Sequence, residues 1–183
     1  MEHPLSPTQA LTRGFVLPAP QLLPAGAAPG GAAAAGTAMQ SRQGFRIGAL
    51  CLMVRYEYGS ELTEMPAVHR LPNAPHWFCG IANLHGMLVP VIELSRYIGA
   101  APGVQAKRML LVLGHGTDAA GVVIDGLPER LRWSTSQLAD AATAPPELAD
   151  VVQHAVFIGE QLWFDLDLAA LLHRLEQSLE SLH

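Results

Sequence analysis

Residues 72–94, PNAPHWFCGIANLHGMLVPVIEL, contain two apolar runs with a short turn-forming segment between them. The runs are His76–Ile81 and Met87–Leu94, and the segment between them includes Asn83-Leu84-His85-Gly86. Asn and Gly at such places are what a tight connection between two strands requires. Two prolines in Pro72-Asn73-Ala74-Pro75 indicate a rigid loop before the first run. The stretch therefore predicts a β-hairpin that is preceded by a rigid loop.

Strand patterns continue on both sides of this hairpin. Apolar runs bounded by turn residues predict further strands at Gly44–Ile47, Ala49–Tyr56, Val68–Leu71, Arg108–Leu113, Ala119–Ile124 and Leu127–Trp133, and a hairpin over Val156–Phe164. Helical patterns are sparse: one capped turn at 134–137, a short helix at Pro145–Gln153, and a C-terminal helix. Asp167 is the expected N-cap of that last helix, whose leucines recur on one face: Leu168, Leu171, Leu172, Leu175, Leu179 and Leu182. Many short strands and one good helix indicate an all-β barrel or sandwich.

The composition limits the kinds of partner that the chain is expected to bind. The chain has 183 residues, of which 50% are hydrophobic and only 15% are charged, and its formal net charge is −5. An ordinary soluble domain carries about 25% charged residues. The low charge predicts that part of the surface is apolar and covered by partners. An acidic chain with 6% aromatic residues lacks both the basic face and the stacking residues of a nucleic-acid binder.

The N-terminal region differs from the rest. Residues 24–38, PAGAAPGGAAAAGTA, cannot bury enough surface to offset the entropy of ordering. We expect residues 1–43 to be a disordered or loosely docked extension, 44–175 to be the folded domain and 176–183 to be the end of the C-terminal helix. Prolines interrupt the weakly polar run Gly14–Ala38, so no membrane insertion is expected.

The sequence shows few signs of a catalytic, cofactor or metal site. Gly114-His115-Gly116 is followed by a strand and not by a helix, which disfavours a phosphate-binding loop. No nucleophile, base and orienting group form a recognisable set, so we expect no enzyme and no cofactor. Cys51 and Cys79 lie in apolar runs and are expected to be buried thiols in a reducing cytoplasm. His76, Cys79 and His85 lack the second ligand pair of a zinc site, so no metal is expected; a metal-dependent sensor or small enzyme using these three residues is the alternative hypothesis.

Residues 72–94 resemble the sequence motif of the CheW-like family, the adaptor domain of bacterial chemosensory arrays. The matching residues are Pro72, Pro75, Trp77, Gly80, Asn83, Leu84, Gly86, Pro90, Val91, Glu93 and Leu94. RMLLVLGHGTDAAGVVIDGL, residues 108–127, is similar to a second block of the family, with Gly121, Asp125 and Gly126 in register. VFIGEQLWFDLDLAALL, residues 156–172, is a weaker third match. The GFRIG start at 44–48 and the N-terminal extension are more similar to the twitching-motility, type IV pilus branch.

The resemblance implies two SH3-like five-stranded β-barrels around a shared core, with a C-terminal helix. It implies a non-enzymatic signal-transduction adaptor that couples chemoreceptors, the methyl-accepting chemotaxis proteins, to a CheA-type histidine kinase of a two-component system. The partners would be the regulatory domain of the kinase and the cytoplasmic tip of the receptor, and the location would be the cytoplasm beside receptor arrays. An alternative hypothesis with the same fold is a role in a chemosensory pathway that does not control motility.

The resemblance also assigns residues to roles. Its receptor- and kinase-binding positions fall on Glu64, Met65, Gly80, His85, Met109 and Leu127. Its structural motif falls on Pro75, Asn83, Gly86, Pro90, Glu93, Gly121, Asp125 and Gly126. Met65, Met109 and Leu127 suit a groove for an amphipathic receptor helix, with ordinary core packing as the alternative. The family usually has Arg where this chain has His85, and that Arg pairs with an acid matching Glu64; we therefore predict that Glu64 and His85 are in contact.

Overall fold

A computed structural model describes residues 39–101 and 107–180 of the chain. The predicted extension up to residue 38 and the helix end beyond residue 180, with Leu182, lie outside the described residues. The strands are β1 (Gln40–Ile47), β2 (Leu50–Arg55), β3 (Ser60–Glu64), β4 (Val68–His69), β5 (Phe78–Leu84), β6 (Met87–Ile92), β7 (Arg108–Leu113), β8 (Ala120–Asp125), β9 (Glu129–Trp133), β10 (Leu138–Ala139), β11 (Val152–Ile158) and β12 (Gln161–Leu166). The α-helices are α2 (Leu94–Tyr97) and α3 (Leu168–Glu180), and 3-10 turns are η1 (Tyr56–Tyr58), η2 (Gly116–Asp118), η3 (Thr135–Gln137), η4 (Ala141–Thr143) and η5 (Pro146–Leu148).

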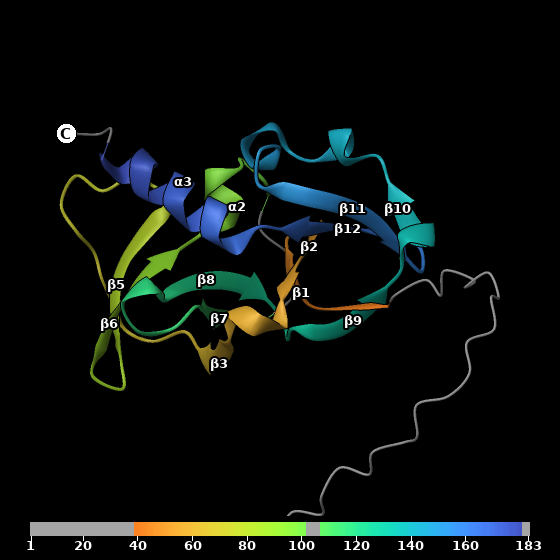
Figure 1. The fold of residues 1–183 in the computed structure, drawn as a ribbon. Helices are drawn as coiled ribbons and strands as arrows, with labels where there is room; N and C mark the ends of the chain where they lie inside the picture. Colours follow the sequence, from red (N-terminus) through yellow and green to blue (C-terminus); the bar gives the residue numbers. More distant parts are fainter. Residues whose placement is uncertain (1–38, 102–106, 181–183) are drawn as a thin grey trace, which may run out of the picture. The chain divides into compact units, whose positions relative to one another are not determined.

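The strands form two sheets that lie side by side (Figure 1). Sheet A has the order β10-β11-β12-β2-β1-β9, and sheet B has the order β3-β7-β8-β6-β5-β4. Sheet A therefore combines segments from both ends of the described chain, whereas the middle of the chain builds sheet B. The parallel pairing of β12 with β2 is the contact that joins the two halves of sheet A.

Each sheet closes into a barrel. In sheet B the edge strands β3 and β4 are separated by residues 65–67 only, a link that reaches about 14 Å when extended. The edges of a flat six-stranded sheet lie about 24 Å apart, so sheet B has to curl until its edges meet. The same holds for β9 and β10, which residues 134–137 join. If β3 and β4 are counted as one bent strand, and β9 and β10 as another, each sheet has five strands. The expected two SH3-like five-stranded barrels are thus confirmed.

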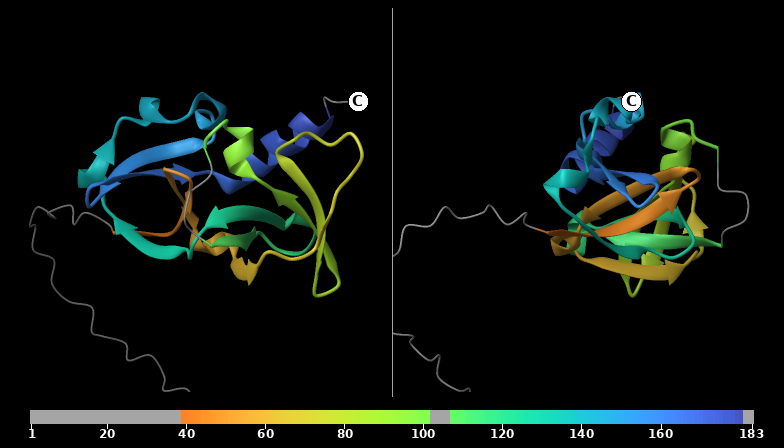
Figure 2. Two further views of the ribbon diagram at one scale, coloured as in Figure 1. Left: turned by 180° about the vertical axis from the view of Figure 1, so that it is seen from behind. Right: turned by 90° about the vertical axis from the view of Figure 1, so that its right-hand side faces the viewer.

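Both barrels share a core that neither could complete alone. The largest cluster of buried side chains contains Leu52 from β2, Leu111 from β7 and Leu171 from α3. Figures 1 and 2 show α3 and α2 on the same side of the two sheets. Alternate residues of β7, such as Leu110, pack in a second cluster within sheet B. Burial on both faces explains why β7 reads RMLLVL, an unbroken apolar run.

Some boundaries differ from the predicted ones because tertiary pairing overrides local pattern. The strand β1 begins at Gln40, because residues 40–44 pair with β9. No strand was predicted at 60–64, where the edge strand β3 pairs with β7. The helix expected at Pro145–Gln153 is only the 3-10 turn η5, since Val152 already pairs with Leu166. The predicted C-terminal helix is confirmed, and Asp167 Oδ1 accepts a hydrogen bond from the Ala170 amide at 3.1 Å.

Two carboxylates, one buried and one half-buried, link strands of the two barrels. Asp165 on β12 is fully buried, and its Oδ1 accepts a hydrogen bond from Arg42 Nε on β1 at 2.8 Å. Asp125, at the end of β8, accepts a hydrogen bond from the Gly48 amide at 2.6 Å. Since Gly48 lies in the turn between β1 and β2, this second bond links sheet B to sheet A. No helix within 39–101 or 107–180 has the length and apolar character to cross a membrane.

The ion pair of Arg42 and Asp165 gives a stability prediction. Asp165→Asn removes the negative charge and leaves the buried Arg42 guanidinium uncompensated, so the free energy of unfolding should fall by about 3 kcal/mol. The matched control is Glu129→Gln, which breaks the exposed pair with Arg46 and should cost less than about 1 kcal/mol. Urea unfolding measures both. Equal losses in the two variants would contradict the assigned role of Asp165.

Candidate binding surface

The turn between β5 and β6 is built by local backbone chemistry. His85 and Gly86 have φ values of 51° and 86°, the left-handed conformations of a two-residue hairpin turn. The Asn83 side chain accepts a hydrogen bond from the Gly86 amide at 2.9 Å and so stabilises the turn. Asn83 and Gly86 thus build the turn, which leaves the His85 side chain 76% exposed at its tip.

The partner of His85 is Glu61, not Glu64. His85 Nε2 lies 3.0 Å from Glu61 Oε1, so the predicted contact between Glu64 and His85 is wrong. Successive side chains of a strand point to opposite faces, and Glu61 and Glu64 are three residues apart on β3. Only Glu61 therefore faces the hairpin. We call Glu61, His85 and the exposed apolar residues Met87 and Leu88 the hairpin tip.

Glu64 has a different partner, Lys107, which directly precedes β7. The Glu64 carboxylate accepts a hydrogen bond from the Lys107 ammonium. This bond, reinforced by the positive charge, lowers the pKa of Glu64 below its ordinary value. Lys107 in turn uses its carbonyl to accept a hydrogen bond from the Gly126 amide at 2.9 Å. The ends of β3 and β8 are therefore both tied to the start of β7.

Met65 and Leu127 are exposed at this same end of sheet B. Met65 follows Glu64, and Leu127 follows the Gly126 amide that Lys107 binds. Leu127 is 72% exposed, which is high for a large apolar side chain. Met109, opposite Glu64 in the register, is instead 9% exposed and belongs to the shared core. We call Glu64, Met65, Lys107 and Leu127 the β3 end.

Gly80 lies in neither place. It is buried in β5 with φ 133°, and an added Cβ would lie 2.2 Å from the carbonyl oxygen of His69. The absence of a side chain lets β4 approach β5 closely. The six expected binding positions are thus divided between the β3 end, the hairpin tip and two interior sites, Gly80 and Met109.

The remaining motif residues hold the frame of sheet B. Glu93 is 4% exposed and forms ion pairs with Arg96, at 2.9 Å, and with Arg108. Pro90 faces Ile81 in the register of β5 and β6, and Gly121 lies where an added Cβ would be 2.8 Å from a Leu110 methyl group. Pro75, Asp125 and Gly126 complete the set: the Pro75 carbonyl accepts from the Phe78 amide at 3.0 Å, Asp125 accepts from Gly48, and Gly126 has φ 78°.

His76, Cys79 and His85 have separate partners. His76 Nε2 lies 3.2 Å from the carbonyl oxygen of Arg96, the Cys79 thiol lies 3.8 Å from Glu93 Oε2, and His85 contacts Glu61. Burial, with the nearby charge of Glu93, raises the pKa of the Cys79 thiol. In the part of the chain that the structure describes, no three His, Cys, Asp or Glu side chains are grouped to hold a metal ion. The metal-dependent alternative therefore has no geometric support.

Sequence reasoning missed Glu61 and Lys107. SELTE, residues 60–64, shows no apolar alternation, so nothing in it predicts an edge strand that would carry Glu61 toward the hairpin. Lys107 lies outside every predicted strand. The position of Lys107 next to the predicted strand at Arg108–Leu113 marks it as a candidate charged residue. The sequence does not indicate that Glu64 is its partner.

Comparison with known proteins identifies relatives of the chain. The sequence model of the CheW-like domain family matches residues 44–176. The chain is 27% identical over 131 residues to the chemotaxis protein CheW of Klebsiella aerogenes, covering 67% of this chain and 79% of that protein. It is 27% identical over 124 residues to the protein PilI of Pseudomonas aeruginosa, covering 66% of this chain and 68% of that protein. The scaffolding protein TtCheW from Thermoanaerobacter tengcongensis shares the fold, with a TM-score of 0.60 at 16% identity over 74% of this chain and 88% of that chain.

The environments of Gly80 and Gly86 predict different costs for the same substitution. Gly80→Ala adds a methyl group against the backbone of β4 as well as a strained φ, and should lower the free energy of unfolding by about 3 kcal/mol. Gly86→Ala adds strain alone, because nothing lies within 4 Å of the new methyl group, and should cost about 1 kcal/mol. Thermal or urea unfolding compares them. A cost for Gly80→Ala no larger than that for Gly86→Ala would refute the packing role.

The Lys107 contact gives a prediction about titration. Lys107→Met removes both the hydrogen bond and the charge, so the pKa of Glu64 should rise to its ordinary value, whereas Lys107→Arg keeps the charge and should leave it lowered. In the native chain the attraction between the Glu64 carboxylate and the Lys107 ammonium is present above the pKa of Glu64. It is lost as the pH falls through that pKa. NMR titration of the Glu64 carboxyl carbon measures the effect. The same pKa in all three proteins would show that the contact is absent in solution.

Proposed function

Because the chain belongs to the CheW-like domain family, we propose that it is a non-enzymatic adaptor that couples chemoreceptors to a CheA-type histidine kinase. Its partners would be the cytoplasmic tip of a methyl-accepting chemotaxis protein and the regulatory domain of the kinase. It would act in the cytoplasm, beside membrane-bound receptor arrays. Relatives named for chemotaxis and for scaffolding support this proposal.

The β3 end is the observation that carries the proposal. Met65 and Leu127 are exposed apolar residues beside the ion pair of Glu64 and Lys107, at positions that the family resemblance assigns to receptor contact. An apolar pair with a charged border is suited to the tip of an amphipathic helix. The low overall charge agrees with a protein that is covered by partners.

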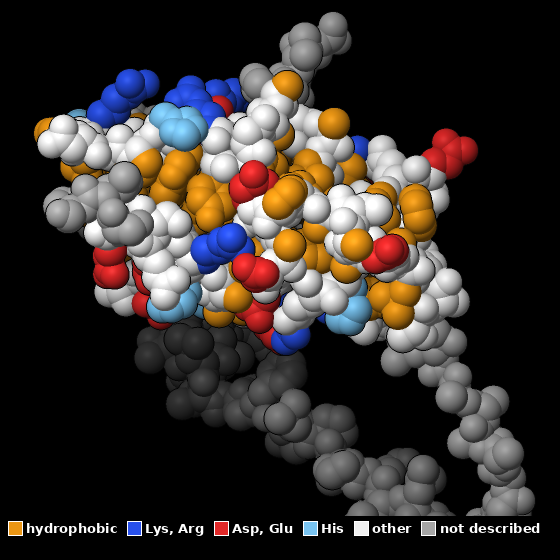
Figure 3. Space-filling view, turned by 90° about the horizontal axis from the view of Figure 1, so that it is seen from above, with side chains coloured by type: hydrophobic (Ala, Val, Ile, Leu, Met, Phe, Trp, Pro, Cys, Tyr) orange, Lys and Arg blue, Asp and Glu red, His pale blue; other side chains and the backbone are white. Residues whose placement is uncertain are grey.

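A separate surface is available for a second partner. The hairpin tip exposes Leu88 and Met87, which are 73% and 44% exposed. On the face that carries α3 and α2, apolar side chains also lie between separated acidic and basic ones (Figure 3). An adaptor has to offer more than one such surface, because it contacts its two partners at the same time.

For the pathway, we infer the twitching-motility branch. The N-terminal extension and the GFRIG segment favour it, and the identity to PilI equals the identity to the CheW of Klebsiella aerogenes. Deletion of the gene should abolish twitching and leave swimming intact if the organism swims. Loss of swimming with normal twitching would assign the chain to a flagellar pathway instead.

Direct binding tests the adaptor role. The chain should bind the regulatory domain of its cognate kinase and a cytoplasmic receptor fragment, measured by calorimetry with each purified partner. Leu127→Glu should weaken receptor binding by about tenfold or more, because a charge replaces the most exposed apolar side chain of the β3 end. Phe157→Glu, which makes the same change at an exposed position of sheet A, is the matched control for receptor binding.

Failure to bind the kinase domain would contradict the adaptor role. Receptor affinity that is unchanged in Leu127→Glu would exclude the β3 end as the receptor surface, even if the kinase domain binds.

A further inference from the structure

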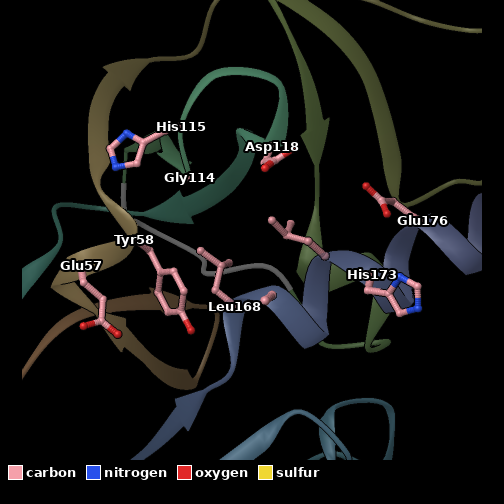
Figure 4. Close-up of a pocket in the computed structure, with 10 residues that line it drawn as sticks. Glu57, Tyr58, Gly114, His115, Asp118, Leu168, His173 and Glu176 are labelled. Atoms are coloured by element: carbon pink, nitrogen blue, oxygen red, sulfur yellow. The ribbon is translucent and has the colours of Figure 1, made fainter.

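Two adjoining hollows lie along the helix α3. The larger, of about 460 Å³, lies between η1, the loop that joins β7 to β8, and α3 (Figure 4). The smaller, of about 80 Å³, continues between α3 and the strands β5 and β6. Asp118, Leu172 and Glu176 line both, so the two hollows form one groove. We call it the α3 groove.

The floor of the α3 groove is apolar and incompletely covered. Leu168, Leu172 and Leu179 are spaced by four and seven residues and so form one stripe along α3. Leu172 and Leu179 are only partly buried, and Tyr58 forms the opposite wall of the larger hollow. Leu168 is buried in the shared core, whereas Leu172 and Leu179 pack against that core and stay partly exposed. The exposed part of the stripe is suited to contact with a second helix.

The rim of the groove is acidic. Glu57, Asp118 and Glu176 come from three different elements and surround the apolar floor, while His115 and His173 are the remaining charged or titratable groups there besides Tyr58 (Figure 4). No Lys or Arg is among the residues described as lining it. Glu57 pairs with Arg55 at 3.1 Å, and Asp118 Oδ1 accepts a hydrogen bond from the neighbouring Thr117 hydroxyl at 3.3 Å. Among the described residues the Glu176 side chain has neither an ion pair nor a hydrogen bond.

We propose that the α3 groove is a docking site for a basic amphipathic helix of a partner protein. The apolar face of that helix would cover Leu172 and Leu179, and its Lys or Arg side chains would pair with Asp118 and Glu176 at the rim. Apolar contact supplies affinity in such a groove, and complementary charge selects the partner. An acidic helix is excluded by the same three carboxylates.

This site is separate from the β3 end. The strands β7 and β8 form a hairpin whose loop, with His115 and Asp118, lines the α3 groove. Lys107 and Leu127 lie beyond the open end of that hairpin, where Arg108 lies opposite Asp125 in the strand register. The two surfaces are therefore at opposite ends of the same strands, and a helix in the α3 groove leaves the β3 end free. The proposal goes beyond the adaptor function and does not depend on it.

Two synthetic peptides test the site with the full chain. One is a 14-residue peptide with Leu on one helical face and Lys on the other, and the matched peptide carries Glu in place of Lys. Fluorescence anisotropy should show binding of the Leu/Lys peptide and at least tenfold weaker binding of the Leu/Glu peptide. Backbone NMR shifts on binding should cluster at Asp118, Leu172 and Glu176.

Charge-reversal variants make the test specific. Asp118→Lys combined with Glu176→Lys should weaken the Leu/Lys peptide by about tenfold, since exposed attractive pairs become repulsive. Glu160→Lys, at an exposed turn between β11 and β12, is the control and should change affinity less than about twofold. Ala169→Arg, an exposed change on α3 that adds charge within the groove, is a second variant if the double variant does not fold.

Three results would overturn the proposal. These are equal affinity for the two peptides, NMR shifts that cluster at the β3 end or the hairpin tip, and an affinity that the charge-reversal variants leave unchanged. None of them would affect binding of the kinase or the receptor, so failure of this proposal is distinguishable from failure of the adaptor role.

Discussion

The whole structure depends on the core that the two barrels share. Strands β2 and β7 are buried on both faces, because each faces the interior of its own sheet on one side and the other sheet on the other. A domain of five short strands has only marginal stability by itself, because a small domain buries a small share of its surface. Here the apolar residues of each sheet are divided between its own interior and the core shared with the other sheet. The helix α3 adds Leu168, Leu171 and Leu175 to the shared core, which explains why the leucine-rich C-terminal helix belongs to the fold.

This packing also fixes where the exposed surfaces lie. Since the middle of β7 and β8 is buried, only the ends of these strands reach solvent, and one end carries Leu127 while the other carries Asp118. The hydrogen bond from the Gly48 amide to Asp125 holds the first of these ends against sheet A. A protein with little surface charge can therefore present apolar contacts in separate places without exposing its core.

The sequence predicts the strands, turns and helix cap better than the exposed binding residues and their partners. Apolar runs and turn residues are local signals, so the β5–β6 hairpin, β7, β8 and the Asp167 cap could be found from them. The strand β3 could not, because SELTE becomes a strand only by pairing with β7. The apolar character of Met109 and Leu127 does not distinguish a core position from an exposed one. Likewise, only the register of β3 decides that Glu61, and not Glu64, reaches His85.

Native-state hydrogen exchange tests the shared core most directly. Amides in the centre of β2, in sheet A, and of β8, in sheet B, should open with the same free energy and respond equally to added urea, because neither barrel persists without the other. The substitution Asp125→Ala, which removes the link to Gly48, should lower both values together. A sheet B that opens at clearly lower free energy while sheet A stays protected, or the reverse, would contradict the account.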